Sequence, residues 1–93
     1  MSNTYQIFLI SDSTGETLER IFLSLKAQFK NIEYKVNSYS FTRTENQILK
    51  ILDLAYKEKN AIILYTIVDN NLAKFLANTC DQKKFHVLGF LEI

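Results

Sequence analysis

The chain has 93 residues, a formal net charge of +1, 47% hydrophobic residues and 23% charged residues. A chain of this length forms one domain and buries about 60–65% of its unfolded surface. The composition is that of an ordinary globular protein, which excludes the disordered and fibrous classes. The 11 Lys and Arg residues are scattered rather than clustered, so the sequence predicts no nucleic-acid interface.

The N-terminal sequence, the length of the apolar runs and the single cysteine indicate the cellular compartment of the protein. It lacks the basic start and apolar segment of a signal peptide, and no stretch approaches roughly 18 consecutive apolar residues. The single cysteine, Cys80, cannot form an intramolecular disulfide and occupies an apolar helical position. A buried thiol of this kind indicates a reducing compartment. We therefore expect a cytoplasmic protein with no membrane contact.

The first half of the chain predicts a strand, a helix and a second strand. Residues 7–10 form an apolar run typical of a buried strand. Residues 13–29 keep helical spacing after a capping-box pair, Ser13 and Glu16. Residues 32–37 alternate apolar and polar side chains, which predicts a half-exposed strand at the edge of a sheet.

The second half repeats this order. Thr44 and Gln47 form another capping-box pattern, and the helix they open keeps its spacing until Asn60. Residues 61–68 are continuously apolar and predict a central strand. Asp69 is a preferred N-cap for a third helix, and residues 85–91 predict a fourth strand.

Strict βαβαβαβ alternation with right-handed crossovers requires a parallel sheet that has helices on its faces. The sequence therefore predicts a single α/β domain, residues 1–93, with a three-layer, Rossmann-like open sheet. The alternating second strand belongs at an edge and the apolar first and third strands belong inside, which favours the strand order 2-1-3-4. Ligands of such sheets bind at the carboxyl ends of the strands where the order reverses, here between strands 1 and 3.

All three strand-to-helix junctions lie at that edge, and each carries polar residues that we expect to converge on one phosphate- or ligand-binding site. The first junction is Ser11 to Thr17, the second is Thr42-Arg43-Thr44, and the third contains Thr66 and Asp69. Arg43 would supply a bidentate cation for phosphate or carboxylate. Asp12 and Asp69 could hold a magnesium ion or orient a hydroxyl group. The candidate binding residues are Ser11, Asp12, Ser13, Thr14, Gly15, Arg43, Thr44 and Asp69.

Helix capping alone would account for several of these residues taken singly, because Ser, Thr and Asp are preferred N-caps. The redundancy of polar groups in residues 11–17 favours a ligand, since a cap needs only one. The sequence shows no metal cluster and no catalytic triad, so no catalytic residue is assigned. The phosphate loop of nucleotide-hydrolysing enzymes ends in Lys and then Ser or Thr, and no lysine follows Gly15 in this way.

Three blocks of sequence resemble one known family, in order and in spacing. They are Ile10-Ser11-Asp12-Ser13-Thr14-Gly15-Glu16-Thr17, Arg43-Thr44-Glu45 and Leu64-Tyr65-Thr66-Ile67-Val68-Asp69. Together they resemble the N-terminal part of the bacterial and plant regulatory proteins of pyruvate, phosphate dikinase and phosphoenolpyruvate synthase. The resemblance covers nearly the whole chain, and its first block is the most specific.

The resemblance implies a bifunctional serine/threonine kinase and pyrophosphorylase. Such a protein uses ADP to phosphorylate a threonine of the dikinase or synthase, and removes that phosphate with inorganic phosphate. Family members are considerably longer, and their nucleotide phosphate loop lies in the C-terminal part. We therefore expect no cofactor site for ADP in this chain, and little or no activity of the chain alone. The alternative is a free-standing phosphate-binding or scaffold module without catalysis.

The end of the chain departs from the family pattern. The family continues after the last strand with an Asp-Pro step, whereas this chain reads Gly89-Phe90-Leu91-Glu92-Ile93, which suggests a split or truncated product. The last strand is also apolar without a protecting proline or lysine, and exposed edges of this kind recruit other strands. We expect it to mediate self-association or to pair with the missing C-terminal half.

Overall fold

The computed structural model of the protein describes residues 4–29, 31–58, 60–82 and 86–89. Strands and helices alternate along them, as predicted for an α/β domain. The elements are β1 (Tyr5–Ser11), α1 (Glu16–Leu25), the 3-10 helix η1 (Lys26–Phe29), β2 (Tyr34–Tyr39), α2 (Glu45–Tyr56), β3 (Ala61–Thr66), α3 (Asn70–Gln82) and β4 (His86–Gly89). Each helix within the described residues is too short or too polar to span a lipid bilayer.

The strands form a parallel sheet in the order β2-β1-β3-β4. β1 pairs with β2 from Tyr5 opposite Tyr34, and with β3 up to Ser11 opposite Thr66. The Rossmann-like class and the predicted order of the first three strands are therefore confirmed. β4 continues the sheet beside β3. Residues 85, 90 and 91 of the predicted fourth strand lie outside the described residues.

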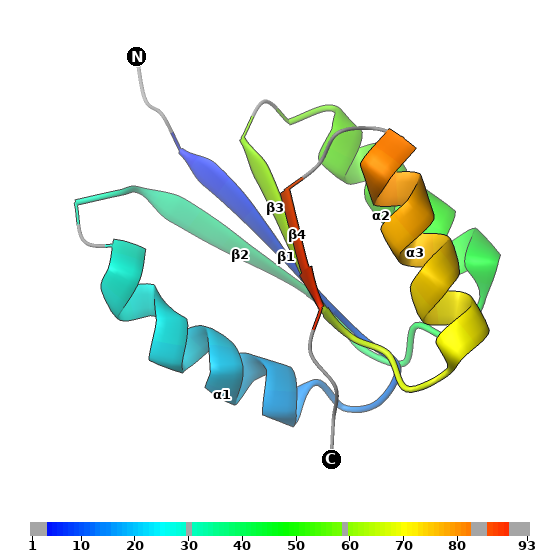
Figure 1. The fold of residues 1–93 in the computed structure, drawn as a ribbon. Helices are drawn as coiled ribbons and strands as arrows, with labels where there is room; N and C mark the ends of the chain where they lie inside the picture. Colours follow the sequence, from blue (N-terminus) through cyan, green and yellow to red (C-terminus); the bar gives the residue numbers. More distant parts are fainter. Residues whose placement is uncertain (1–3, 30, 59, 83–85, 90–93) are drawn as a thin grey trace.

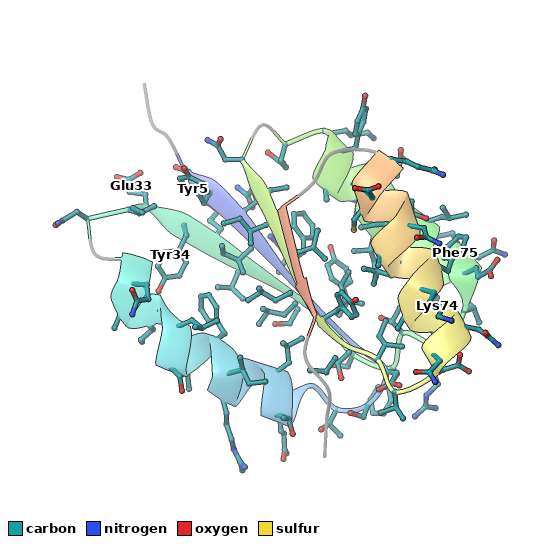
Figure 2. The ribbon with its side chains drawn as sticks, in the orientation of Figure 1. Tyr5, Glu33, Tyr34, Lys74 and Phe75 are labelled. Carbon is teal, nitrogen blue, oxygen red and sulfur yellow. The ribbon has the colours of Figure 1, made fainter. Side chains whose placement is uncertain are left out.

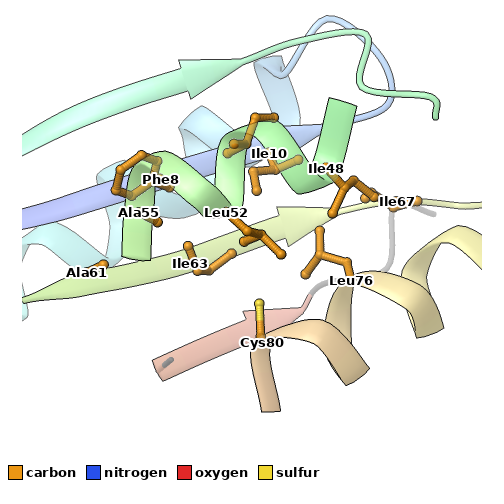
Figure 3. Close-up of a cluster of buried hydrophobic side chains, with 11 residues drawn as sticks. Phe8, Ile10, Ile48, Leu52, Ala55, Ala61, Ile63, Ile67, Leu76 and Cys80 are labelled. Carbon is orange, nitrogen blue, oxygen red and sulfur yellow. The ribbon is translucent and has the colours of Figure 1, made fainter. Parts of the chain in front are cut away.

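Helices cover both faces of the sheet, with α1 on one face and α2 and α3 together on the other (Figure 1). The smaller apolar cluster lies under α1 and joins Leu18 and Phe22 to the sheet. The larger cluster lies under α2 and α3 (Figure 3). Its buried members are Phe8, Ile10, Ile48, Ile51, Leu52, Ala55, Ala61, Ile63, Ile67, Leu76 and Cys80. Both faces of β1 are thus buried, which explains its unbroken apolar sequence.

β2 is an edge strand, as its alternating sequence predicts. Tyr34 points toward α1 (Figure 2), where its ring meets Phe22 edge-on at 5.6 Å between centroids. Val36, on the same face of the strand, is 42% exposed. The helix layer therefore covers only part of this strand.

The sequence places the start of the first helix wrongly and that of the second correctly. The helix does not open with a Ser13–Glu16 capping box: α1 begins at Glu16, and its N-cap is Gly15, with φ 86° and no side-chain cap. Gly15 takes the left-handed conformation, which moves the helix start past Ser13. In contrast, Thr44 and Gln47 form both hydrogen bonds of a capping box at the start of α2.

Candidate functional site

The carboxyl ends of β1 and β3 meet at a pair of buried hydroxyl groups. Ser11 and Thr66 lie opposite each other in the parallel register and are almost completely buried. Thr66 Oγ1 donates to Ser11 Oγ at 3.4 Å, and Ser11 Oγ also accepts from the Ser13 backbone N–H at 3.1 Å. This pair satisfies polar groups at the switch point and fixes the path of the chain after β1.

Asp12 connects the first junction to the third. Its Oδ2 accepts a hydrogen bond from the Val68 N–H at 2.8 Å, and its own N–H donates to the Thr66 carbonyl at 3.3 Å. The carboxylate is thereby fixed by the segment between β3 and α3. Such a charged acceptor makes a stronger hydrogen bond than a neutral one.

The second junction reaches the first through Arg43. Its Nε donates to the Asp12 carbonyl oxygen at 3.1 Å, and its guanidinium carbon lies 5.1 Å from the centroid of the Phe41 ring. The N–H groups of Phe41 and Thr42 donate to the Ser13 and Ser11 carbonyls, each at 2.9 Å. Within the described residues, the remaining guanidinium N–H groups of Arg43 form no hydrogen bond, so they are available to an anion.

Thr44 and Asp69 serve as helix caps in this structure. Thr44 Oγ1 accepts from the Gln47 N–H at 3.1 Å, and Asp69 Oδ1 accepts from the Leu72 N–H at 3.0 Å. The carboxylates of Asp12 and Asp69 thus both accept from backbone groups. No group of three or more His, Cys, Asp or Glu side chains among the described residues is placed to hold a metal ion.

The start of α1 presents backbone donors next to these junctions. The Glu16 N–H has only a long bond to Thr14 Oγ1, at 3.4 Å, and the Thr17 and Leu18 N–H groups form none within the described residues. Gly15 and Ser11 line a small cavity of about 10 Å³, which holds no more than one water molecule. An anion at this helix end must therefore bind on its open side.

Acidic residues oppose such binding. Glu16 and Glu19 lie in the first turn of α1, where they already complement the positive end of the helix dipole. Any anion must compete with these two carboxylates. The two carboxylates lower the affinity of this helix start for an anion, and Arg43 is the nearby cation.

The three junctions do come together as predicted, through contacts of Ser11, Asp12 and Arg43. Sequence analysis missed two polar groups that hold them. Ser40 Oγ donates to the Thr14 carbonyl at 3.1 Å, and Gln47 Oε1 accepts from the Arg43 N–H at 2.7 Å. Gln47 carried a signal as the partner of Thr44 in the capping box, whereas Ser40 carried none.

The buried thiol lies away from these junctions. Burial raises the pKa of Cys80 to about 11. Burial, and then the neighbouring Cys80, also raise the pKa of Tyr65. A thiol with a raised pKa is a poor nucleophile, so Cys80 acts as a core side chain.

The fold and the site define an α/β domain of Rossmann-like class in which three strand-to-helix junctions form one polar site at the switch point. Within that class the chain can be assigned further. A family model described as kinase/pyrophosphorylase matches residues 7–93, and the chain belongs to that family.

Curated relatives agree with this assignment. The chain is 72% identical to a protein of Pelagibacter ubique over 98% of its own length, and 38% identical to one of Geotalea uraniireducens over 92%. A protein of Agrobacterium fabrum is 42% identical over 91% of the chain. All three are named pyruvate, phosphate dikinase regulatory protein. The chain covers 34%, 32% and 29% of these relatives, or about a third of their length.

Proposed function

We propose that this chain is the N-terminal part of a regulatory phosphotransferase that acts on pyruvate, phosphate dikinase or phosphoenolpyruvate synthase. Its membership of the kinase/pyrophosphorylase family supports this, as do the names of its relatives. In this proposal the complete protein phosphorylates a threonine of its target with ADP and removes the phosphate with inorganic phosphate. The chain contains no Gly-rich loop ending in Lys and Ser or Thr, so we assign nucleotide binding to the part of the relatives beyond the match.

The contribution of this chain is a phosphate site at residues 11–17, assisted by Arg43. One observation carries this part of the proposal. Asp12 hydrogen-bonds both to Val68 and to Arg43, so the three junctions are held around the start of α1. The unused N–H groups at that helix start can donate to phosphate oxygens.

Phosphate titration followed by amide chemical shifts tests this site. Each exposed helix-terminus charge contributes about 0.3–1 kcal/mol, so the dissociation constant should be on the order of millimolar. We expect the shifts at residues 13–16. Arg43→Ala should weaken binding about two- to fivefold. Arg20→Ala, an exposed arginine on α1, is the matched control and should leave the affinity unchanged.

Shifts outside residues 11–17, or an affinity unchanged by Arg43→Ala, would contradict the site. The regulatory role is tested separately with purified pyruvate, phosphate dikinase. The regulatory proposal predicts measurable binding of the chain to the dikinase, without phosphate transfer from ADP or ATP by the chain alone. A free-standing phosphate-binding scaffold predicts the same phosphate shifts and no binding to the dikinase.

Association through the last strand is a further part of the proposal. β4 ends the sheet, and no described residue pairs with its outer edge. The chain is expected either to self-associate there or to pair with the remainder of a longer protein. Light scattering over a range of concentrations tests the first case, and a monomer at every concentration would exclude it.

A further inference from the structure

A groove lies between β2 and α2, and it shares Ser40, Thr42 and Gln47 with the surroundings of residues 11–17, here called the phosphate turn. Its volume is about 250 Å³, and its walls include Tyr39 from the strand and Gln47, Lys50, Ile51 and Leu54 from the helix. Pockets for complete small molecules usually measure about 300–1,000 Å³. This groove is smaller and fits one or two side chains of a longer partner.

The edge of β2 beside the groove is open. Alternate residues of a parallel strand direct their peptide groups to one neighbour. The Tyr5 N–H donates to the Glu33 carbonyl, so the peptide groups of Lys35 and Asn37 face β1, whereas those of Val36 and Ser38 face outward. Within the described residues no strand pairs with this edge. It offers donors and acceptors at the spacing of an extended peptide.

The wall of the groove carries one positive charge. Lys50 is the one charged side chain among the residues that line it. Lys35 lies on the same face of β2 as Tyr39, because the two are four positions apart and side chains two positions apart share a face. A partner segment with a carboxylate beside an apolar side chain would complement both the lysines and the apolar wall of the groove.

We propose that the groove between β2 and α2 binds an extended, acidic segment of a partner protein, which adds to the sheet as a strand along the outer edge of β2. Lys50 and Leu54 are four residues apart on α2, a rise of about 6 Å. Two residues of a strand span about 6.6 Å. A leucine and a glutamate in the pattern Leu-x-Glu therefore reach Leu54 and Lys50 from the same face of the added strand. The proposed contacts use Lys50 and Leu54, which are not among the candidate phosphate-binding residues.

Two short peptides test the proposal without knowledge of the natural partner. The probes are Ser-Leu-Thr-Glu-Thr and its reverse, Thr-Glu-Thr-Leu-Ser, which represent the parallel and antiparallel orientations. Each is blocked at both ends and titrated into the labelled chain to about 2 mM. We expect a dissociation constant on the order of 0.1–1 mM for one of them, since a short flexible peptide must be ordered on binding. Amide shifts should appear at Val36, Ser38, Lys50 and Leu54.

Matched variants separate the groove from the rest of the surface. Leu54→Ser and Lys50→Glu should each weaken the peptide at least fivefold. Leu49→Ser is the control for the first, because Leu49 is 43% exposed and Leu54 is 49% exposed on the same helix, and Leu49 does not line the groove. Lys74→Glu is the control for the second, because Lys74 lies on the exposed side of α3 (Figure 2). Circular dichroism verifies that each variant is folded.

A peptide methylated at its backbone nitrogens tests strand addition directly, because it keeps the side chains and loses the N–H groups that would donate to the β2 carbonyls. It should bind at least tenfold more weakly. Equal binding of the methylated peptide, shifts away from β2 and α2, or no shifts with either probe would overturn the proposal. Concentration-dependent shifts at Val36 and Ser38 without peptide would assign the edge to a second copy of the chain and would also overturn it.

Discussion

Substitution of Gly15 tests the geometry on which the polar site depends. Gly15 is the N-cap of α1 and has φ 86°, in the left-handed region. An alanine there would place its Cβ 3.7 Å from Ser40 Oγ and 3.9 Å from Ser11 Cβ, which are ordinary contact distances. The cost of Gly15→Ala is therefore conformational rather than steric. The left-handed conformation costs an L-residue about 1–2 kcal/mol, and the stiffer unfolded chain offsets about 0.4–1 kcal/mol of this.

The expected net loss is about 1 kcal/mol, which corresponds to a fall of about 4–8 °C in Tm for a domain of this size. Thermal and urea unfolding followed by circular dichroism will measure it. Gly15→Asn is the control, because asparagine tolerates the left-handed region better, and it should lose less than half as much. Stability of Gly15→Ala equal to the wild type would refute the left-handed assignment. A larger loss for Gly15→Asn would show that side-chain size, not conformation, sets the cost.

Three further predictions concern the caps, the junctions and the buried thiol. Thr44→Ala should lower the free energy of unfolding in urea by about 1 kcal/mol. Thr14→Ala should lower it by less than half as much, because the bond from the Glu16 N–H to Thr14 Oγ1 is long at 3.4 Å. Equal losses for the two variants would contradict this. Asp12→Ala should lower the free energy of unfolding by about 1 kcal/mol. Asp12→Asn should lower it clearly less, because its amide oxygen can still accept from the Val68 N–H. Equal losses would exclude this hydrogen bond as the cause. The free energy of unfolding should fall between about pH 9 and pH 11, because the raised pKa of Cys80 disfavours the thiolate in the folded chain, so the unfolded chain loses its proton first. Cys80→Ala should reduce this fall, and an unchanged slope would contradict the assignment.

Much of the fold followed from the sequence because its signals are local. The apolar runs of β1 and β3 placed these strands inside the sheet, and the alternation from Ile32 to Asn37 placed β2 at the edge. The Thr44 cap was predictable because Gln47 lies three residues later in the chain. Ser13 and Glu16 have the same pattern, yet no capping box forms there, because the conformation of Gly15 moves the start of the helix.

The polar site was predicted in outline and not in detail. Its convergence follows from topology, since the carboxyl ends of parallel strands meet at one edge of the sheet. Its contacts depend on residues far apart in the chain, such as Asp12 with Val68, and no local pattern indicates such pairs. The groove beside β2 was not predicted, because it depends on how far α2 extends over an edge strand.

The hydrogen bonds among the three junctions affect how the domain opens. The N–H groups of Thr42, Asp12 and Val68 all donate to groups of another junction. Each of these bonds joins two loops, so a loop that frays also removes a hydrogen bond from a second loop. Opening of this edge is therefore expected to be a cooperative local unfolding event, with similar hydrogen-exchange protection at all three amides. A change that loosens one junction would therefore lower the hydrogen-exchange protection of the other two, without any movement of the sheet beneath them.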